Sequence, residues 1–422
     1  MIYTKPANEI TWDDIESFCQ QGIPEGAYLD YKQDFPKDLA KVIAAMANTF
    51  GGIVLIGIEE DDENKPITPV TGIPFKRGLS ERVTNIILSN LTPPVFPEIA
   101  VITNGDRSQA IILVRIQQSH QTPHAIKDNT KVYLRTGNRN KPEELARVDQ
   151  IEWLRDYRRK SEDLREDLYT RAKARVATLY NRHLEREFNI QQIAELKDWA
   201  EHGWLTIFLC PLYPKDILAL PPQINGEVLP KVKVHARYGM SNFPMFSSHS
   251  RIVHNGVLIH FSEEAKRAFH VELNSFGSYF YKQIVLRDRR LGEMHGRRLP
   301  YIEIFSRLNE FMGSSVRFYR MLHYWGPLQF RVHLGRIDRF PLDPHPIDML
   351  DEPLPLSPDI ELEFDDTVLA SDLESEGERL VFEALRRIGW AFNLDFRRDH
   401  LLSFYAKAGI DPTKEPLGSA NR

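Results

Sequence analysis

The sequence predicts a mixed α/β (α+β) protein with more than one domain. Apolar residues at helical spacing alternate with short strand-like runs in the first third of the chain, which is typical of helices packed around a sheet. The chain has 422 residues, more than the usual size of a single hydrophobic core. Its composition changes after residue 147, where a long charged segment begins. We therefore expect two α/β domains joined by a helical connector.

The first domain is expected over residues 1–147. A helix over 11–20 has Thr11 as a suitable N-cap and places Ile15 and Phe18 on one face. Residues 53–58 form a nearly continuous apolar run, as expected of a strand buried on both faces. The other expected elements are helices over 38–48 and 79–90 and strands over 28–32, 98–103, 109–116 and 131–135.

The rest of the chain divides by composition into four further parts. Residues 148–189 are expected to form a charged helical connector, because no proline or glycine occurs between positions 149 and 187. A second α/β domain follows, with expected strands over 205–210, 231–238, 256–261 and 328–337 and a helix over 300–322. This second domain is expected over 190–340. A proline-rich linker follows over 341–358, and the last part is an acidic segment over 359–422 that contains one helix near its middle.

Charge and cysteine content exclude several classes of protein. The net charge of −5 and the pI near 6.3 provide no overall positive field, although a local basic groove remains compatible with them. The two cysteines, Cys19 and Cys210, have no CxxC spacing, so neither a disulfide framework nor a zinc site is supported. The sequence contains no apolar stretch of membrane-spanning length and no phosphate-binding P-loop motif. We therefore expect a cytoplasmic protein without a membrane partner.

Three acidic residues of the first domain are candidate metal ligands. Glu60 follows the apolar strand over 53–58, at the end where open α/β sheets usually bind ligands. If the strand over 28–32 pairs beside it, Asp30 and Glu60 converge, with Glu25 close by. Carboxylates that meet in this way can share a hard divalent cation, Mg²⁺ or Mn²⁺, which can activate water for phosphodiester cleavage. The alternative is that all three are surface carboxylates at strand ends.

Four basic residues are candidate contacts for phosphate groups. Lys32 shares a face with Asp30, and Arg135, Arg139 and Lys141 form a cluster at the end of the strand over 131–135. A salt bridge between Lys32 and Asp30 is the alternative for the first residue. A solvated loop is the alternative for the other three.

The ordered set of motifs in the first domain resembles the Schlafen/AlbA-type family. The motifs are EGAYLDYK at 25–32, ANTFGG at 47–52 leading into an apolar strand with two acidic residues, and KVYLRTGN at 131–138. The resemblance implies a Schlafen/AlbA-like domain over roughly 15–150. Vertebrate members with this core include RNA endonucleases that use three acidic residues, which by motif fall on Glu25, Asp30 and Glu60. Asp30 replaces the commoner Glu, so its reach is shorter by about one methylene.

The resemblance also implies the partners. Vertebrate nuclease cores contain two such lobes, whereas one copy is recognisable here, so the second domain or a second subunit in a homodimer would complete the groove. The leading hypothesis is a protein that binds RNA, with tRNA among the candidates, or DNA, and acts as a metal-dependent endoribonuclease. One alternative is a non-catalytic DNA- or RNA-binding regulator or antiviral defence component. Another is a nucleotide-binding module in which the turn at Gly51 and Gly52 approaches a phosphate.

Overall fold

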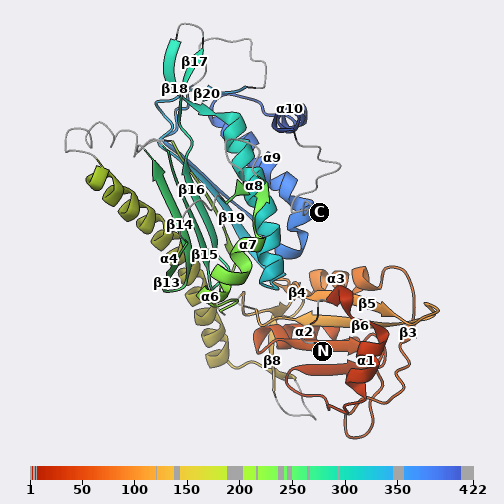
Figure 1. Cartoon of the computed structure of the whole chain (residues 1–422). Helices are drawn as coiled ribbons and strands as arrows, with labels where there is room; N and C mark the ends of the chain where they lie inside the picture. Colours follow the sequence, from red (N-terminus) through yellow and green to blue (C-terminus); the bar gives the residue numbers. More distant parts are fainter. Residues whose placement is uncertain are drawn as a thin grey trace. The chain divides into compact units, whose positions relative to one another are not determined.

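A computed structural model of the chain divides into two compact units, Met1–Asp163 and Leu164–Arg422, each of which is described by itself (Figure 1). It describes residues 2, 5, 7–119, 121–136, 143–187, 203–214, 217–235, 242–244, 250–263, 267–291, 294–345 and 356–409. The two units are called unit 1 and unit 2 below. Their boundary falls inside one long helix, α4 (Val148–Glu187).

Unit 1 contains a five-stranded mixed sheet and a smaller four-stranded one. The larger sheet has the order β1-β2-β6-β3, with β5 also paired to β6, and the smaller sheet has the order β4-β7-β8-β9. The elements are η1 (Ala7–Glu9), α1 (Trp12–Cys19), β1 (Leu29–Lys32), α2 (Leu39–Asn48), β2 (Gly52–Ile56), β3 (Ile73–Pro74), α3 (Leu79–Asn90), β4 (Leu91–Thr92), β5 (Glu98–Thr103), β6 (Gln109–Ile116), β7 (Ala125–Ile126), β8 (Lys131–Arg135) and β9 (Glu143–Leu145).

Strand β2 lies at the centre of unit 1, which confirms the sequence prediction for the apolar run. It pairs in parallel with β1 and antiparallel with β6. Its side chains alternate between two apolar clusters: Ile53 and Leu55 pack with α1, whereas Val54 and Ile56 pack with α2 and α3. Helix α1 begins as predicted, with the side chains of Thr11 and Asp14 forming a capping box.

Unit 2 is built around a seven-stranded sheet with the order β13-β14-β15-β16-β10-β19-β21. Its elements are β10 (Trp204–Pro211), α6 (Pro221–Gln223), η2 (Ile224–Val228), α7 (Leu229–Lys231), β11 (Val234–His235), β12 (Asn242–Phe243), β13 (Arg251–Val253), β14 (Gly256–Glu263), β15 (Arg267–Asn274), β16 (Tyr279–Ile284), β17 (Arg287–Leu291), β18 (Met294–Pro300), α8 (Tyr301–Met321), β19 (Pro327–Gly335), β20 (Leu342–Asp343), β21 (Glu361–Leu369), η3 (Ala370–Asp372), α9 (Leu373–Ala391) and α10 (Arg398–Ala408).

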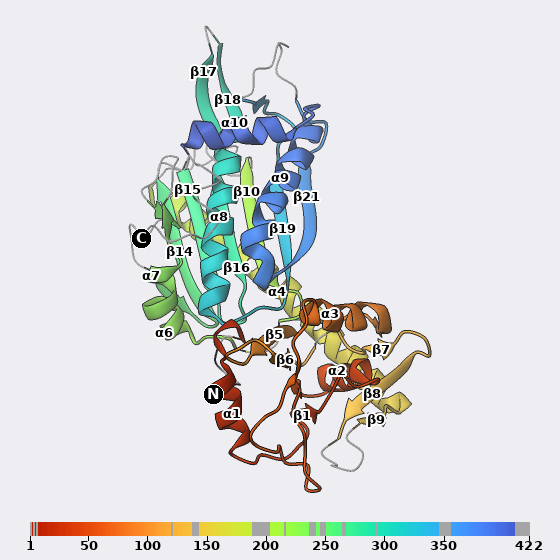
Figure 2. The same ribbon diagram turned by 90° about the vertical axis from the view of Figure 1, so that its right-hand side faces the viewer.

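Helices cover both faces of the large sheet in unit 2. Figures 1 and 2 show α8 and α9 on one face and the later part of α4 on the other. The α4 face is partly apolar, because Leu168, Ala172 and Val176 are buried in the same core as the strands. The expected solvated connector is therefore an incomplete description of α4. Its exposed side does carry the expected i,i+4 pairs, such as Arg158 with Glu162.

The segment after the proline-rich stretch completes the sheet of unit 2. We expected a separate segment over 359–422, but β21 pairs with β19 from Glu361 to Leu369, and α9 packs into the same core. A second difference concerns the strand expected over 231–238. Lys231 ends the helical turn α7, which is favoured by Pro230 near its start, and only β11 is a strand in the described part of that range.

In the part of the chain that the structure describes, no helix has both the length and the apolar character needed to cross a bilayer.

Candidate functional site

The parallel pairing of β1 with β2 positions the acidic residues of unit 1. Asp30 lies opposite Val54 in the register, and Lys32 lies opposite Ile56. Beyond β2, the backbone N–H groups of Gly57 and Ile58 donate to the carbonyl oxygen of Lys32, at 2.7 and 3.1 Å. The chain then runs through Glu60, which forms an isolated bridge with Pro66. The carboxyl ends of β1 and β2 therefore lie at the same edge of the sheet. The predicted approach of Asp30 to Glu60 depends on this arrangement.

Glu25 and Asp30 share one cation, the ammonium group of Lys32. Lys32 Nζ lies 3.1 Å from Glu25 Oε1 and also forms an ion pair with Asp30. Glu25 Oε1 additionally accepts a hydrogen bond from the backbone N–H of Tyr31 at 2.7 Å. The salt bridge between Lys32 and Asp30, which the sequence left as an alternative, is thus present. Burial opposes the charge of Lys32, but attraction to Asp30 and Glu25 outweighs it and raises the pKa of the ammonium group.

Glu60 is the acidic residue whose protonation is changed most clearly. Burial, followed by the negative charge of Glu25, raises the pKa of Glu60 to about 8, and Asp30 adds to the effect. Burial and the charge of Asp30 likewise raise the pKa of Glu25. Each carboxylate therefore lies within electrostatic reach of the others. We call Glu25, Asp30, Lys32 and Glu60 the carboxylate–lysine cluster.

Arg135 is a buried structural residue, which corrects its expected role as a phosphate contact. Its guanidinium group is inaccessible to solvent; Nη2 lies 2.6 Å from Asp30 Oδ2, and Nη1 pairs with Glu143. Further bonds go to the carbonyl oxygens of Gly26 and Leu29, at 3.1 to 3.2 Å. Because its side chain is withdrawn from solvent and bonded to these partners, Arg135 is not accessible to a phosphate group. It joins β8 to β1 instead.

Of the other three predicted phosphate contacts, the structure describes Lys32 but not Arg139 and Lys141. Lys32 is about a quarter exposed, but its charge is shared between Glu25 and Asp30. Arg139 and Lys141 lie outside the described residues. They follow β8 in the sequence, and the end of β8 lies beside the turn after α2, because the N–H of Arg135 donates to Thr49 Oγ1 at 2.8 Å.

The cluster as it stands does not fit a divalent cation. Among the described residues, no group of three or more His, Cys, Asp or Glu side chains is placed to hold a metal ion. The ammonium group of Lys32 provides the physical reason, because it contacts both Glu25 and Asp30, where a shared cation would have to bind. The second oxygen of Asp30 is paired with Arg135. Positive charge for these carboxylates is thus supplied by the protein itself.

Sequence reasoning missed two polar residues that join the elements around this site. Asn48 is fully buried: its Nδ2 donates to the carbonyl oxygens of His124 and Tyr133, at 2.9 and 3.0 Å, and its Oδ1 accepts from the N–H of His124 at 2.8 Å. Glu143 pairs with both Arg135 and Lys41. The Asn-Thr pair that ends α2 is the available signal, but by itself it indicates only a helix stop.

The family comparison covers the part of the chain that contains this site. Residues 25–144 match the model of the family described as Schlafen, AlbA_2. The match includes every member of the carboxylate–lysine cluster, as well as Asn48, Arg135 and Glu143. No curated protein is significantly similar to the chain in sequence.

Two solved structures are similar to part of the chain. One is the N-terminal domain of a RecG-related protein from Nitrosomonas europaea, with 18% identity and a TM-score of 0.24, covering 28% of this chain and 82% of that one. The other is the DIP2311 protein from Corynebacterium diphtheriae, with 16% identity and a TM-score of 0.20. It covers 29% of this chain, and the chain spans only 24% of that protein.

Proposed function

We propose that unit 1 binds nucleic acid and that RNA is its main partner, because residues 25–144 match the family model described as Schlafen, AlbA_2. The observation that carries the proposal is the coincidence of the family match with the cluster at the ends of β1 and β2. Asp30 is buried and Glu25 and Glu60 are partly buried, so burial and mutual repulsion both oppose the charges of Glu25 and Glu60. Carboxyl groups perturbed in this way are typical of functional sites. Arg139 and Lys141 are the proposed phosphate contacts.

The experiment for binding compares two pairs of basic residues that lie on either side of the middle of β8 in the sequence. In the full chain, Arg139→Ala with Lys141→Ala should weaken RNA binding, and should reduce the slope of log affinity against log salt concentration by about one for each phosphate contact that the substitutions remove. The matched control is Lys127→Ala with Lys131→Ala. Both lysines are exposed, and they lie at the other end of β8 from Arg135. Equal affinity of both double variants and the wild type would place the RNA elsewhere.

Metal-dependent cleavage of RNA is a second proposal, supported by one feature of the cluster. Lys32 pairs with Glu25 and Asp30, and burial together with the neighbouring carboxylates raises the pKa values of Glu25 and Glu60. Displacement of Lys32, for example by a phosphate group, would free the oxygen atoms that Mg²⁺ or Mn²⁺ prefers. Without such displacement, the same site would serve a non-catalytic RNA-binding regulator.

Replacement of Lys32 separates these two possibilities. Lys32→Met removes the ammonium group and leaves the three carboxyl groups without it, so added Mn²⁺ should raise the melting temperature of this variant more than that of the wild type. Lys37→Met, at an exposed position of the same unit, is the control and should behave as the wild type. If Mn²⁺ stabilises neither protein and the wild type cleaves no RNA, the nuclease proposal is wrong and the regulator remains.

A further inference from the structure

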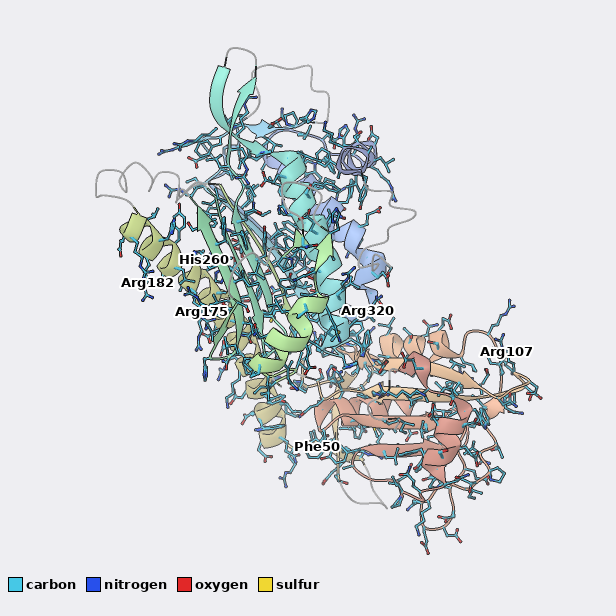
Figure 3. All side chains as sticks on the ribbon, viewed as in Figure 1. Phe50, Arg107, Arg175, Arg182, His260 and Arg320 are labelled. Carbon is cyan, nitrogen blue, oxygen red and sulfur yellow. The ribbon has the colours of Figure 1, made fainter. Side chains whose placement is uncertain are left out.

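Two exposed aromatic side chains form a pair at one edge of unit 1. Tyr28 and Phe50 are each 54% exposed, and their ring centroids are 5.4 Å apart with 42° between the ring planes. They come from different segments: Tyr28 precedes β1, and Phe50, labelled in Figure 3, lies in the turn between α2 and β2. Single exposed aromatic residues are common on protein surfaces. Two aromatic side chains that contact each other, and that are each still more than half exposed, form an apolar surface on which a ligand can stack.

The backbone holds this aromatic pair in a fixed place. The N–H of Ile53 donates to the carbonyl oxygen of Tyr28 at 2.8 Å, as part of the parallel pairing of β1 with β2. Gly51 and Gly52 have φ values of +73° and +152°, and a Cβ atom at Gly52 would lie 2.6 Å from the carbonyl oxygen of Tyr28. The turn thus packs directly against the residue before β1. A platform held in this way loses little conformational entropy when a flat group stacks on it.

The surroundings of the aromatic pair indicate which partner fits. Tyr28 lies in the bend just before β1, two residues before the buried Asp30. Thr49, next to Phe50, accepts a hydrogen bond from the N–H of Arg135. The pair therefore lies where β1 and β2 begin, beside the end of β8. The chain leaving β8 contains the proposed phosphate contacts Arg139 and Lys141 in its sequence.

We infer that Tyr28 and Phe50 form a stacking platform for unpaired bases, so that the preferred ligand is single-stranded nucleic acid; this rests on the nucleic-acid binding proposed above. Bases offer a π-face only when they are not stacked within a duplex, and aromatic platforms beside cationic segments are the usual way to bind them. RNA and single-stranded DNA share this chemistry. A contact with the 2′-hydroxyl group would distinguish them, so both polymers are needed in the test.

The test measures binding of the full chain to labelled oligonucleotides of about 12 nucleotides by fluorescence anisotropy. Phe50→Ala and Tyr28→Ala should each weaken binding of single strands by about 5- to 100-fold, without changing the salt dependence, because no charge is removed. Phe50→Trp should keep the affinity, and its fluorescence should be quenched when the single strand binds. Phe96→Ala is the matched control, since Phe96 is 44% exposed in the same unit.

Each possible outcome has a definite meaning. If the bases stack on the aromatic pair, the alanine substitutions should reduce the affinity for an oligonucleotide with abasic positions less than the affinity for an intact single strand. They should have little effect on the affinity for a duplex. Unimpaired single-strand binding by both alanine variants would overturn the inference but leave the proposed function intact. Conversion of a wild-type dimer into a monomer by Phe50→Ala would also overturn it, since a second copy of the chain would then cover the aromatic pair. A wild type that binds neither RNA nor DNA would overturn the proposed function as well.

Discussion

Arg135 Nη2 lies 2.6 Å from Asp30 Oδ2, and both side chains are almost completely withdrawn from solvent. The pair joins β8 of the smaller sheet to β1 of the larger one. A charge buried in this way is stable only while its partner is present, because desolvation is not compensated otherwise. The conformation of Asp30, and with it the carboxylate–lysine cluster, therefore depends on a residue that itself cannot reach a ligand.

Removal of this guanidinium group should destabilise unit 1. We expect Arg135→Met to lower its free energy of unfolding by about 3–5 kcal/mol, because Asp30 and Glu143 are each deprived of a buried partner. Arg77→Met, at an exposed position, should change stability by less than about 0.5 kcal/mol. Urea unfolding of the full chain, with hydrogen exchange of peptides from unit 1, measures the difference. A stable Arg135→Met variant that is impaired only in RNA affinity would instead support the phosphate contact expected from the sequence.

The stability of unit 1 should fall as the pH rises through the titration of Glu60. The pKa of Glu60 is raised to about 8 in the folded protein, so between its ordinary value and pH 8 the folded state binds more protons than the unfolded state. We expect a loss of about 1–2 kcal/mol over this range, reduced by the partial exposure of the side chain. Glu60→Gln should remove this loss, whereas Glu59→Gln at the exposed neighbouring position should not. An unchanged pH profile in Glu60→Gln would show that Glu60 is ionised at neutral pH.

Much of unit 1 could be predicted from the sequence because its elements are defined by local patterns. The apolar run at 53–58 and the capping residues at Thr11 and Asp14 act within a few residues, and each gave the correct element. The expected convergence of Asp30 and Glu60 depended on one further assumption, that the strand over 28–32 pairs beside the apolar strand; the structure confirms this pairing and shows that it is parallel.

The role of Arg135 could not be predicted, because it depends on long-range partners. Arg135 is 105 positions from Asp30 in the sequence (135 − 30 = 105), and nothing near it indicates that its side chain is buried. The Tyr28–Phe50 pair was missed for the same reason, since its formation depends on strand pairing. The segment over 359–422 was separated from unit 2 because proline composition reports on the local backbone and gives no information about the β19–β21 pairing.

Asn48 should tolerate no change in its hydrogen-bonding pattern. Asn48→Asp is nearly isosteric but replaces the Nδ2 donor with an acceptor that faces the carbonyl oxygens of His124 and Tyr133. We expect a loss of about 2–4 kcal/mol at neutral pH, because two acceptors are left without their donor and a buried charge is created. Asn85→Asp, at an exposed position of α3, is the control. Thermal unfolding of the two variants checks this, and equal melting temperatures would contradict it.

Unit 2 should lose stability in mild acid through His260. His260 of β14 lies opposite His270 of β15, with the ring centroids 5.6 Å apart, and Arg251 contributes a further positive charge near it. Figure 3 shows His260 near α4, on the side of the sheet where Arg175 lies. Burial and the neighbouring histidines lower the pKa of His260 to about 4.

The sign of this effect follows from proton binding. Below about pH 6.5 this histidine becomes protonated in the unfolded chain, whereas His260 in the folded protein stays neutral. The free energy of unfolding therefore falls by about 1–3 kcal/mol as the pH drops toward 4. His260→Asn should flatten this dependence, and His254→Asn, at an exposed position nearby, should leave it unchanged. Urea unfolding at pH 7 and pH 5 tests the prediction, which fails if both variants respond to pH as the wild type does.

The central claim, that unit 1 binds RNA beside the carboxylate–lysine cluster, is tested most directly by ultraviolet crosslinking. The full chain would be irradiated with single-stranded RNA, and the crosslinked peptides identified by mass spectrometry. Our account predicts crosslinks within residues 25–145, with Tyr28 and Phe50 among the modified positions, and their disappearance at high salt concentration. Crosslinks confined to residues 164–422, or none at low salt concentration, would contradict it.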